Sequence, residues 1–283
     1  RPVRRSSGSG DVFIPVIIIL LGVTILSLLI AFVWQKWQDK YDPDYLYPDS
    51  RPASSQSESS SEASEPSSSE ESSSEPESSA VQFGQPVPES ERVTSAYFND
   101  AVFIGDSLTT GIQLYNILPD TTVLAAVGVG LENIYTQEVI GTEDSKQTIL
   151  EAADAQQPAK IYVMLGVNEL GWNGTDTFRN QSAKLIERLQ ADHPETQIVL
   201  QSILPISARQ EEKGTYVNNE RIAVYNQVLQ ELAETYGVTY LNVAEAVADE
   251  DGFLRADWNF DGVHLNQEGC QALLAYLRTH PVE

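Results

Sequence analysis

Serine and histidine are the residues of this sequence whose types and positions could carry out covalent chemistry together. The stretch VFIGDSLTTG, residues 102–111, runs from apolar residues with β-strand character directly into Gly-Asp-Ser. Gly105 ends the expected strand, so Ser107 would lie at its carboxyl end, the edge at which parallel α/β sheets bind ligands. A serine after an aspartate is also an ordinary helix N-cap. This stretch alone leaves both a nucleophile and a cap open.

A nucleophilic serine needs a base, and the base needs an acid that orients it. The chain holds three histidines: His193 between a helical pattern and the next strand, His264 in NFDGVHLNQEG, and His280 in the C-terminal tail. His264 follows the last expected strand, and Asp261 three residues earlier can reach its ring within one tight turn. We therefore predict His264 as the base and Asp261 as its orienter. The alternative is a loop in which the aspartate caps a turn and the histidine is solvated.

Two further segments offer hydrogen-bond donors of the kind that stabilise an oxyanion. AAVGVG places Gly128 and Gly130 after the second expected strand, and LGVNE places Gly166 and Asn168 after the third. A backbone N–H and a side-chain amide are suitable donors for an oxyanion hole, although the same residue types are common in turns. Because both segments share the carboxyl edge with Ser107, we expect them to lie near it.

The elements that must hold these residues in place alternate between strands and helices. Helical patterns separate the apolar runs and are clearest in residues 177–190 and 218–237. In the second stretch five residues follow the spacing of a buried stripe. A final helix is expected from about Asn266 to Thr279. Alternation of this kind predicts right-handed crossovers and a three-layer α/β/α fold with a five-stranded parallel sheet. The stripe consists of Ile222, Tyr225, Leu229, Leu232 and Tyr236, and the five runs are residues 101–105, 122–128, 160–166, 197–204 and 238–243.

Taken together, four short blocks resemble the SGNH (GDSL) hydrolase superfamily. They are GDSL near the start of the domain, a glycine after the second strand, GxN after the third, and DxxH near the end. The resemblance spans about residues 101–280, with the blocks in order. It implies a flavodoxin-like sheet order and a serine esterase or acylhydrolase that needs no cofactor.

The resemblance also implies a role for each matching residue. Ser107 corresponds to the nucleophile, His264 to the base and Asp261 to its orienter. The oxyanion hole would consist of the Ser107 N–H, the Gly130 N–H and the Asn168 side chain. Gly130 is preferred to Gly128, because the family's glycine usually closes this segment. One departure concerns the residue after the asparagine, which is often aspartate in the family and here is glutamate, Glu169.

The N-terminal part of the chain has a different composition. Between Val12 and Val33, 22 positions carry no charge, which is long enough for a helix to cross a bilayer. The following segment is rich in serine and glutamate and is expected to be a disordered tether. The basic N-terminal flank favours an N-terminus inside the cell membrane and an extracellular catalytic domain. We therefore divide the chain into a short basic cytoplasmic segment 1–11, a transmembrane helix 12–34, a linker 35–91 and a hydrolase domain 92–283.

Charge narrows the possible partners of the domain. From residue 92 onward there are 11 Lys and Arg against 27 Asp and Glu, a net charge of −16. Binding of nucleic acid is therefore not expected, and a neutral or sugar-like substrate fits better. No metal or nucleotide motif is present, so neither a metal nor another cofactor is expected. Cys270 is the only cysteine, so no intrachain disulfide can form.

The function expected from these observations is a serine ester hydrolase that works through an acyl-enzyme. Its substrate is expected to be an acylated small molecule or glycan, with removal of short acyl groups such as acetyl from cell-surface glycans. Two alternatives stay open. One is an O-acyltransferase that uses the same three residues. The other is a non-catalytic wall-binding module with exposed aromatic platforms, for which Trp172 and Trp258 are candidates.

Overall fold

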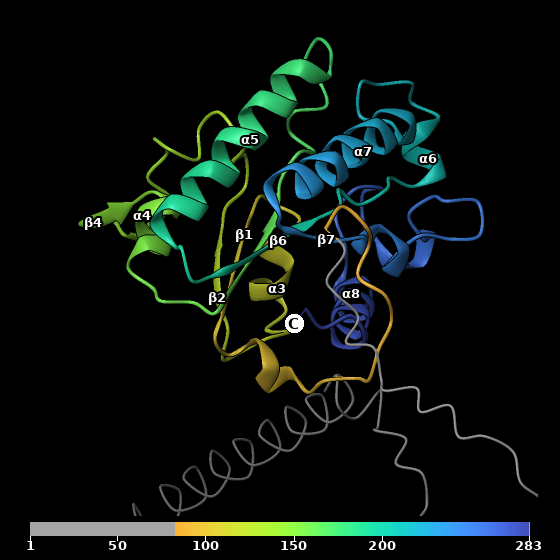
Figure 1. Ribbon diagram of the computed structural model, residues 1–283. Coiled ribbons are helices and arrows are strands. Elements are labelled where there is room, and N and C mark those ends of the chain that lie inside the picture. The colour runs from red at the N-terminus through yellow and green to blue at the C-terminus, as the bar shows by residue number, and fades with distance from the viewer. Residues whose placement is uncertain (1–82, 283) are drawn as a thin grey trace, which may run out of the picture. The chain divides into compact units, whose positions relative to one another are not determined.

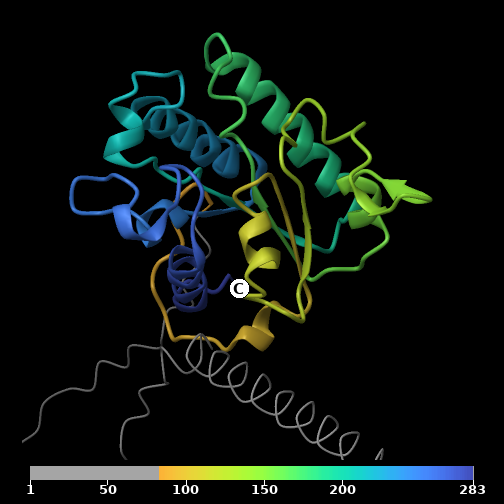
Figure 2. The ribbon, with the colours of Figure 1, turned by 180° about the vertical axis from the view of Figure 1, so that it is seen from behind.

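The computed structural model describes residues 83–282, which contain a five-stranded parallel sheet with helices on both faces (Figures 1 and 2). The strand order is β2-β1-β5-β6-β7, which is the flavodoxin-like order 2-1-3-4-5 once strands are counted along the sheet's own sequence. The predicted α/β fold is therefore confirmed for these residues. The strands are β1 (Ala101–Gly105), β2 (Thr122–Ala125), β5 (Lys160–Met164), β6 (Gln197–Gln201) and β7 (Thr239–Leu241).

Two long helices, α5 (Thr175–Asp192) and α7 (Asn219–Tyr236), lie side by side on one face of the sheet (Figures 1 and 2). The opposite face carries α3 (Thr110–Leu114) and α8 (Gln267–Thr279). A small antiparallel hairpin, β3 and β4, lies outside the main sheet. The helices are α3 (Thr110–Leu114), α4 (Ile149–Asp154), α5 (Thr175–Asp192), α6 (Ala208–Glu211), α7 (Asn219–Tyr236) and α8 (Gln267–Thr279), with short 3-10 turns at Ser95–Phe98, Val243–Ala246 and Ala256–Trp258; the hairpin is β3 (Ile140–Thr142) and β4 (Ser145–Gln147).

The central strands are buried because helices cover both faces of the sheet. Every residue of β1 and of β5 is buried, as is typical of parallel strands with continuous apolar sequences. Phe103 of β1 and Tyr162 of β5 stack with their ring centroids 4.6 Å apart. The strands end earlier than the sequence predicts, because the residues that follow β2, β5 and β6 leave the sheet as loops at its carboxyl edge.

Helix α7 forms where the apolar stripe predicts it. Asn218 caps its first turn by accepting the Arg221 N–H, and Gly237 ends it with a left-handed φ of 60°. Of the predicted stripe, Tyr236 alone is partly exposed, while the other four residues are buried. α8 likewise starts after Asn266, whose side chain accepts the Gly269 N–H.

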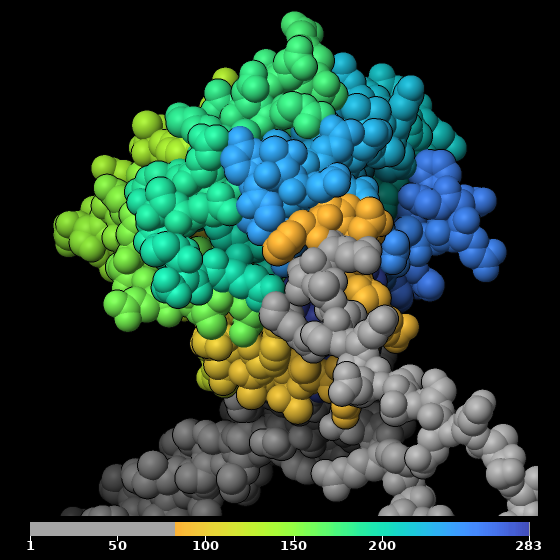
Figure 3. All heavy atoms as spheres, viewed as in Figure 1, coloured from red at the N-terminus to blue at the C-terminus, as the bar shows by residue number. Residues whose placement is uncertain are grey.

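Contacts with the domain begin before residue 92. We call residues 83–93 the N-terminal strap. Its backbone pairs with β7 through Val87 N–H to Tyr240 O at 3.1 Å, and with the end of α8 through Ser90 N–H to Thr279 O at 2.8 Å. Figure 3 shows orange spheres of the strap against the blue surface of α7, where Gly84 packs closely on Glu234. The packed part of the chain thus includes residues that the sequence analysis assigns to the linker.

The segment 1–11, the predicted transmembrane helix 12–34 and most of the linker 35–91 lie outside the described residues. Within residues 83–282, no helix combines the length and the apolar character needed to cross a membrane.

Candidate active site

Ser107 lies in the turn between β1 and α3. The Asp106 carboxylate accepts the Leu108 N–H at 2.9 Å, and the Thr110 hydroxyl donates to the Ser107 carbonyl at 2.7 Å. These bonds hold the turn, so the role of Asp106 here is structural. The N-cap position of α3 is Thr109. The capping role considered for Ser107 is therefore wrong, and its hydroxyl group is available for another partner.

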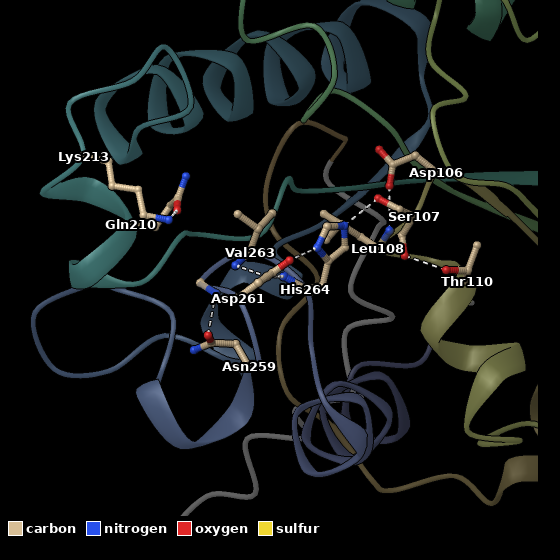
Figure 4. A network of polar contacts seen from close by, with 11 residues as sticks. Asp106, Ser107, Leu108, Thr110, Gln210, Lys213, Asn259, Asp261, Val263 and His264 are labelled. Carbon is tan, nitrogen blue, oxygen red and sulfur yellow. Dashed lines mark hydrogen bonds and ion pairs between the residues drawn. The ribbon is translucent and has the colours of Figure 1, made fainter.

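That partner is His264. The Ser107 Oγ lies 2.9 Å from His264 Nε2, and His264 Nδ1 lies 2.7 Å from Asp261 Oδ2 (Figure 4). The other carboxylate oxygen of Asp261 accepts the N–H groups of Val263 at 2.9 Å and of His264 at 2.8 Å. The structure thus joins the three predicted residues in one chain of hydrogen bonds across 157 residues of sequence. Such a chain can activate a serine hydroxyl and stabilise an imidazolium ion.

The loop that carries Asp261 and His264 is fixed against α6. The Asn259 side chain accepts the Gly262 N–H at 2.7 Å, and the Ser207 N–H donates to the Gly262 carbonyl at 2.9 Å. Gly262 has a φ of 96°, and a Cβ built there would lie 2.7 Å from Ser207 Oγ. A glycine is required here because of both the backbone conformation and the close approach.

Two of the predicted oxyanion donors, Gly130 and Asn168, lie on loops that contact each other. The Asn168 side chain donates to the Val129 carbonyl at 2.7 Å, so it touches the segment that contains Gly130. The Gly130 N–H donates to Asn133 Oδ1 at 2.8 Å, and the Asn133 amide donates back to the Gly128 carbonyl at 3.0 Å. Gly130 is buried and Gly128 is exposed. An oxyanion bound at the Gly130 N–H would share or replace the bond to Asn133.

Comparison with protein families identifies the fold. Residues 103–272 match the model of the GDSL-like Lipase/Acylhydrolase family. The chain belongs to this family. As a GDSL-like acylhydrolase, it is an enzyme that hydrolyses ester bonds. A search of curated proteins found no match.

Solved structures include several that resemble this acylhydrolase. A Streptococcus pneumonia protein provisionally described as a platelet activating factor is 28% identical, with a TM-score of 0.51 over 63% of this chain and 81% of that one. A GDSL-like lipase from Bacteroides thetaiotaomicron is 17% identical, with a TM-score of 0.48 over 66% and 88%. A mutant of an acetyl-xylooligosaccharide esterase from Geobacillus stearothermophilus is 16% identical, with a TM-score of 0.46 over 65% and 94%.

Two carboxyl groups of the acylhydrolase site have shifted pKa values of opposite sign. Partial burial acts to raise the pKa of Asp261, but hydrogen bonds from His264 and Val263 outweigh it and lower that pKa below its ordinary value. Burial raises the pKa of Asp106 to about 7, against the opposing effect of the Leu108 N–H. Asp261 is therefore an anion at neutral pH, as the partner of a charged imidazole must be.

Asn133 and Asn259, which were not among the predicted site residues, hold the loops of the site in place. Both use their side chains to bind backbone groups within five residues. Asparagine side chains commonly bond backbone groups in turns, and each of these asparagines lies three residues from a glycine, in NFDG and in GLEN. This spacing could have indicated a turn at both positions, but it does not show which backbone groups are bound.

The other two histidines and the cysteine take no part in the hydrogen-bonded chain of Ser107, His264 and Asp261. His193 is buried at the end of α5, with Nε2 3.3 Å from an Asp154 oxygen. His280 is ordered, since its ring stacks on Tyr276 with a centroid distance of 3.7 Å. Burial raises the pKa of Cys270 to about 12. No cluster of His, Cys, Asp and Glu within residues 83–282 could hold a metal ion.

The two candidate aromatic platforms are not fully exposed. Trp172 and Trp258 are both partly buried against the core. The Arg255 guanidinium lies over the Trp258 ring, 4.1 Å from its centroid. One face of Trp258 is therefore already occupied, which reduces its use as a platform for binding a polysaccharide.

Proposed function

We propose that Ser107 is the nucleophile of this acylhydrolase, with His264 as general base and Asp261 as the orienter of its ring. The observation that carries this proposal is the continuous chain of hydrogen bonds from Ser107 Oγ through both ring nitrogens to Asp261, with distances of 2.9 and 2.7 Å. We propose further that the substrates are short acyl esters, in particular O-acetyl groups on glycans of the cell surface.

The reaction would proceed in two halves. Ser107 Oγ bonds to the ester carbonyl carbon while its proton passes to His264 Nε2, and the carbonyl oxygen becomes an oxyanion. The N–H groups of Ser107 and Gly130 and the side chain of Asn168 receive this oxyanion. His264 then gives its proton to the leaving alcohol, which leaves an acyl-enzyme. In the second half, His264 activates a water molecule, and the acid and free Ser107 are released.

Charge and sequence support the choice of substrate. The domain carries a net charge of −16, which disfavours anionic substrates and leaves neutral sugars as suitable carriers of the acyl group. The apolar stretch 12–34 and the Ser/Glu-rich stretch 35–91 support a single-pass protein of the cell membrane with its N-terminus inside and the catalytic domain outside. An enzyme held in that way would meet envelope glycans first.

The acyl-enzyme could also pass its acyl group to a sugar hydroxyl. The side chains of Asp261 and His264 are 43% and 34% exposed, so either water or a sugar hydroxyl can approach the base. An O-acyltransferase is therefore the second candidate function. A product that forms only when an acceptor sugar is added together with an acyl donor would identify it.

The first test is hydrolysis of p-nitrophenyl acetate, butyrate and octanoate by the purified protein and by Ser107→Ala. We expect preference for acetate, and a loss of kcat of at least about 1,000-fold in the variant because the nucleophile is gone. Ser145→Ala, an exposed serine of β4, is the matched control and should keep full activity. Turnover retained by Ser107→Ala would contradict the assignment. Acetate release from O-acetylated polysaccharide then tests the glycan part.

A further inference from the structure

Asn168 and Glu169, two consecutive residues after β5, hold the segment around Gly130 from both sides. The Asn168 side chain donates to the Val129 carbonyl at 2.7 Å, and the Glu169 carboxyl accepts the Leu131 N–H at 2.7 Å. Gly130 lies between these two contacts. The position of its N–H therefore depends on Glu169 as much as on Asn168, although no chemical step described above uses Glu169.

The Glu169 side chain fits closely against this segment. It is 3% exposed, and a Cβ built on Gly130 would lie 2.1 Å from its Oε1. Its backbone carbonyl also accepts the Tyr225 hydroxyl at 3.1 Å, which ties the residue to α7. A buried side chain held at both ends can transmit a fixed geometry to the loop that it contacts.

The second carboxyl oxygen of Glu169 distinguishes it from an ordinary structural acceptor. Oε2 is buried and has no hydrogen-bond partner within the part of the chain that the structure describes. A buried carboxylate with an unpartnered oxygen is costly, whereas the neutral acid avoids most of that cost. The charged and titratable groups around Glu169 come from three segments: Asp106 after β1, Glu132 after β2, and Tyr225 and Arg221 of α7. Arg221 donates to the neighbouring Leu170 carbonyl.

Burial and a like charge act together on the carboxyl group of Glu169. Burial raises the pKa of Glu169, the Leu131 N–H opposes that rise, and the charge of Glu132 adds to it. Asp106 and Glu169 interact as like charges, and this interaction adds to the effect of burial that raises the pKa of Asp106 to about 7. A negative charge on Glu169 would also oppose the negative charge that develops on the ester oxygen.

We propose that Glu169 is a positioning residue whose carboxyl group accepts the Leu131 N–H and thereby fixes the Gly130 N–H beside Asn168. This proposal rests on the proposed function, since it assigns the oxyanion to this segment. Loss of the acceptor lowers kcat, because the Gly130 N–H is then no longer held where the oxyanion of the transition state forms.

The test compares Glu169→Gln and Glu169→Ala in the complete chain, with kcat and KM for p-nitrophenyl acetate measured at about pH 7. Glutamine keeps an acceptor oxygen, so kcat should remain within about threefold. Alanine removes the acceptor, so kcat should fall about 10-fold or more while KM changes less than about threefold. Glu138→Gln, an exposed carboxylate of the same loop, should leave kcat and KM unchanged.

Each result decides the proposal. A Glu169→Ala variant with kcat within about twofold of the wild type overturns the positioning role. A folded Glu169→Gln variant that is as impaired as Glu169→Ala overturns the role of the acceptor oxygen. If the alanine variant does not fold, as judged by thermal unfolding, the kcat of the glutamine variant decides alone. Ser107→Ala separates the two proposals: its inactivity leaves the function standing even when the Glu169 variants behave as wild type.

Discussion

At the scale of single residues, Asp261 serves two purposes with one carboxylate. Its Oδ1 accepts two backbone N–H groups and so forms the turn, while Oδ2 faces the ring of His264. The bonds that build the turn also lower the pKa of the carboxyl group, in opposition to its partial burial. Local structure and the charge needed beside the imidazole therefore come from the same contacts.

The choice between Gly130 and Gly128 as donor can be decided by two alanine substitutions. A Cβ at Gly130 would lie 2.1 Å from Glu169 Oε1, so Gly130→Ala should displace the segment and lower kcat about 100-fold. Gly128 has a φ of 79°, and a Cβ built there would have no other atom within 4 Å. Gly128→Ala should therefore cost about 1 kcal/mol of stability, while kcat stays within about threefold. Kinetics and thermal unfolding measure both effects. The reverse pattern, inactivation by Gly128→Ala alone, would move the donor to Gly128.

The sequence identifies the residues whose side-chain chemistry is distinctive. Ser107, Asp261, His264 and Asn168 can be found because their types, their order and the expected strand ends agree. The contact of Glu169 with Leu131 joins residues 38 positions apart, and no local pattern indicates such a pair. A glycine's place in an oxyanion hole likewise depends on the direction of one N–H, which residue type does not encode.

At the scale of elements, the loop between β7 and α8 is positioned by its contact with α6. Gly262→Ala would bring a Cβ 2.7 Å from Ser207 Oγ and 2.9 Å from Gln210 Cβ. We expect the loop to separate from α6 and to move His264, so that kcat falls about 10-fold or more and stability falls by about 1–3 kcal/mol.

Gly252 supplies the matched control for this experiment. Its φ of 84° requires the same kind of backbone, but a Cβ there would meet nothing within 4 Å. Gly252→Ala should therefore lose about 1 kcal/mol of stability and keep its kcat. Equal kcat for Gly262→Ala and Gly252→Ala would show that contact with α6 does not position the base.

Elements with a clear apolar period were predictable, and those held by distant contacts were not. The five parallel strands and the helices α5, α7 and α8 follow apolar runs or stripes, and the structure confirms them. The hairpin β3–β4 was missed because most of its residues are polar and exposed. Its sequence therefore lacks the alternation of apolar and polar residues that indicates a strand. The N-terminal strap was assigned to a linker because its stability comes from β7 and α8, more than 140 residues away.

At the scale of the whole molecule, the strap should contribute measurably to stability. A chain that starts at residue 92 loses the bonds of Val87 to Tyr240 and of Ser90 to Thr279. Two backbone hydrogen bonds and the packing of the strap suggest a loss of about 2 kcal/mol, or roughly 5 °C in Tm for a domain of this size. The comparison is with a chain that starts at residue 83, by thermal unfolding and by kcat. Identical Tm values would show that the strap adds nothing, whereas kcat should not change.

The strap also fixes the edge of the sheet at which the chain enters the domain. Gly84 packs on Glu234 near the end of α7, and Ser90 binds Thr279 at the end of α8. Both helix ends lie at the amino edge of the sheet, while α8 starts beside His264 about 20 Å away at the other edge. The chain therefore enters the domain at the edge opposite the catalytic residues. A label or a second protein fused in front of residue 83 would consequently meet the domain away from Ser107 and His264.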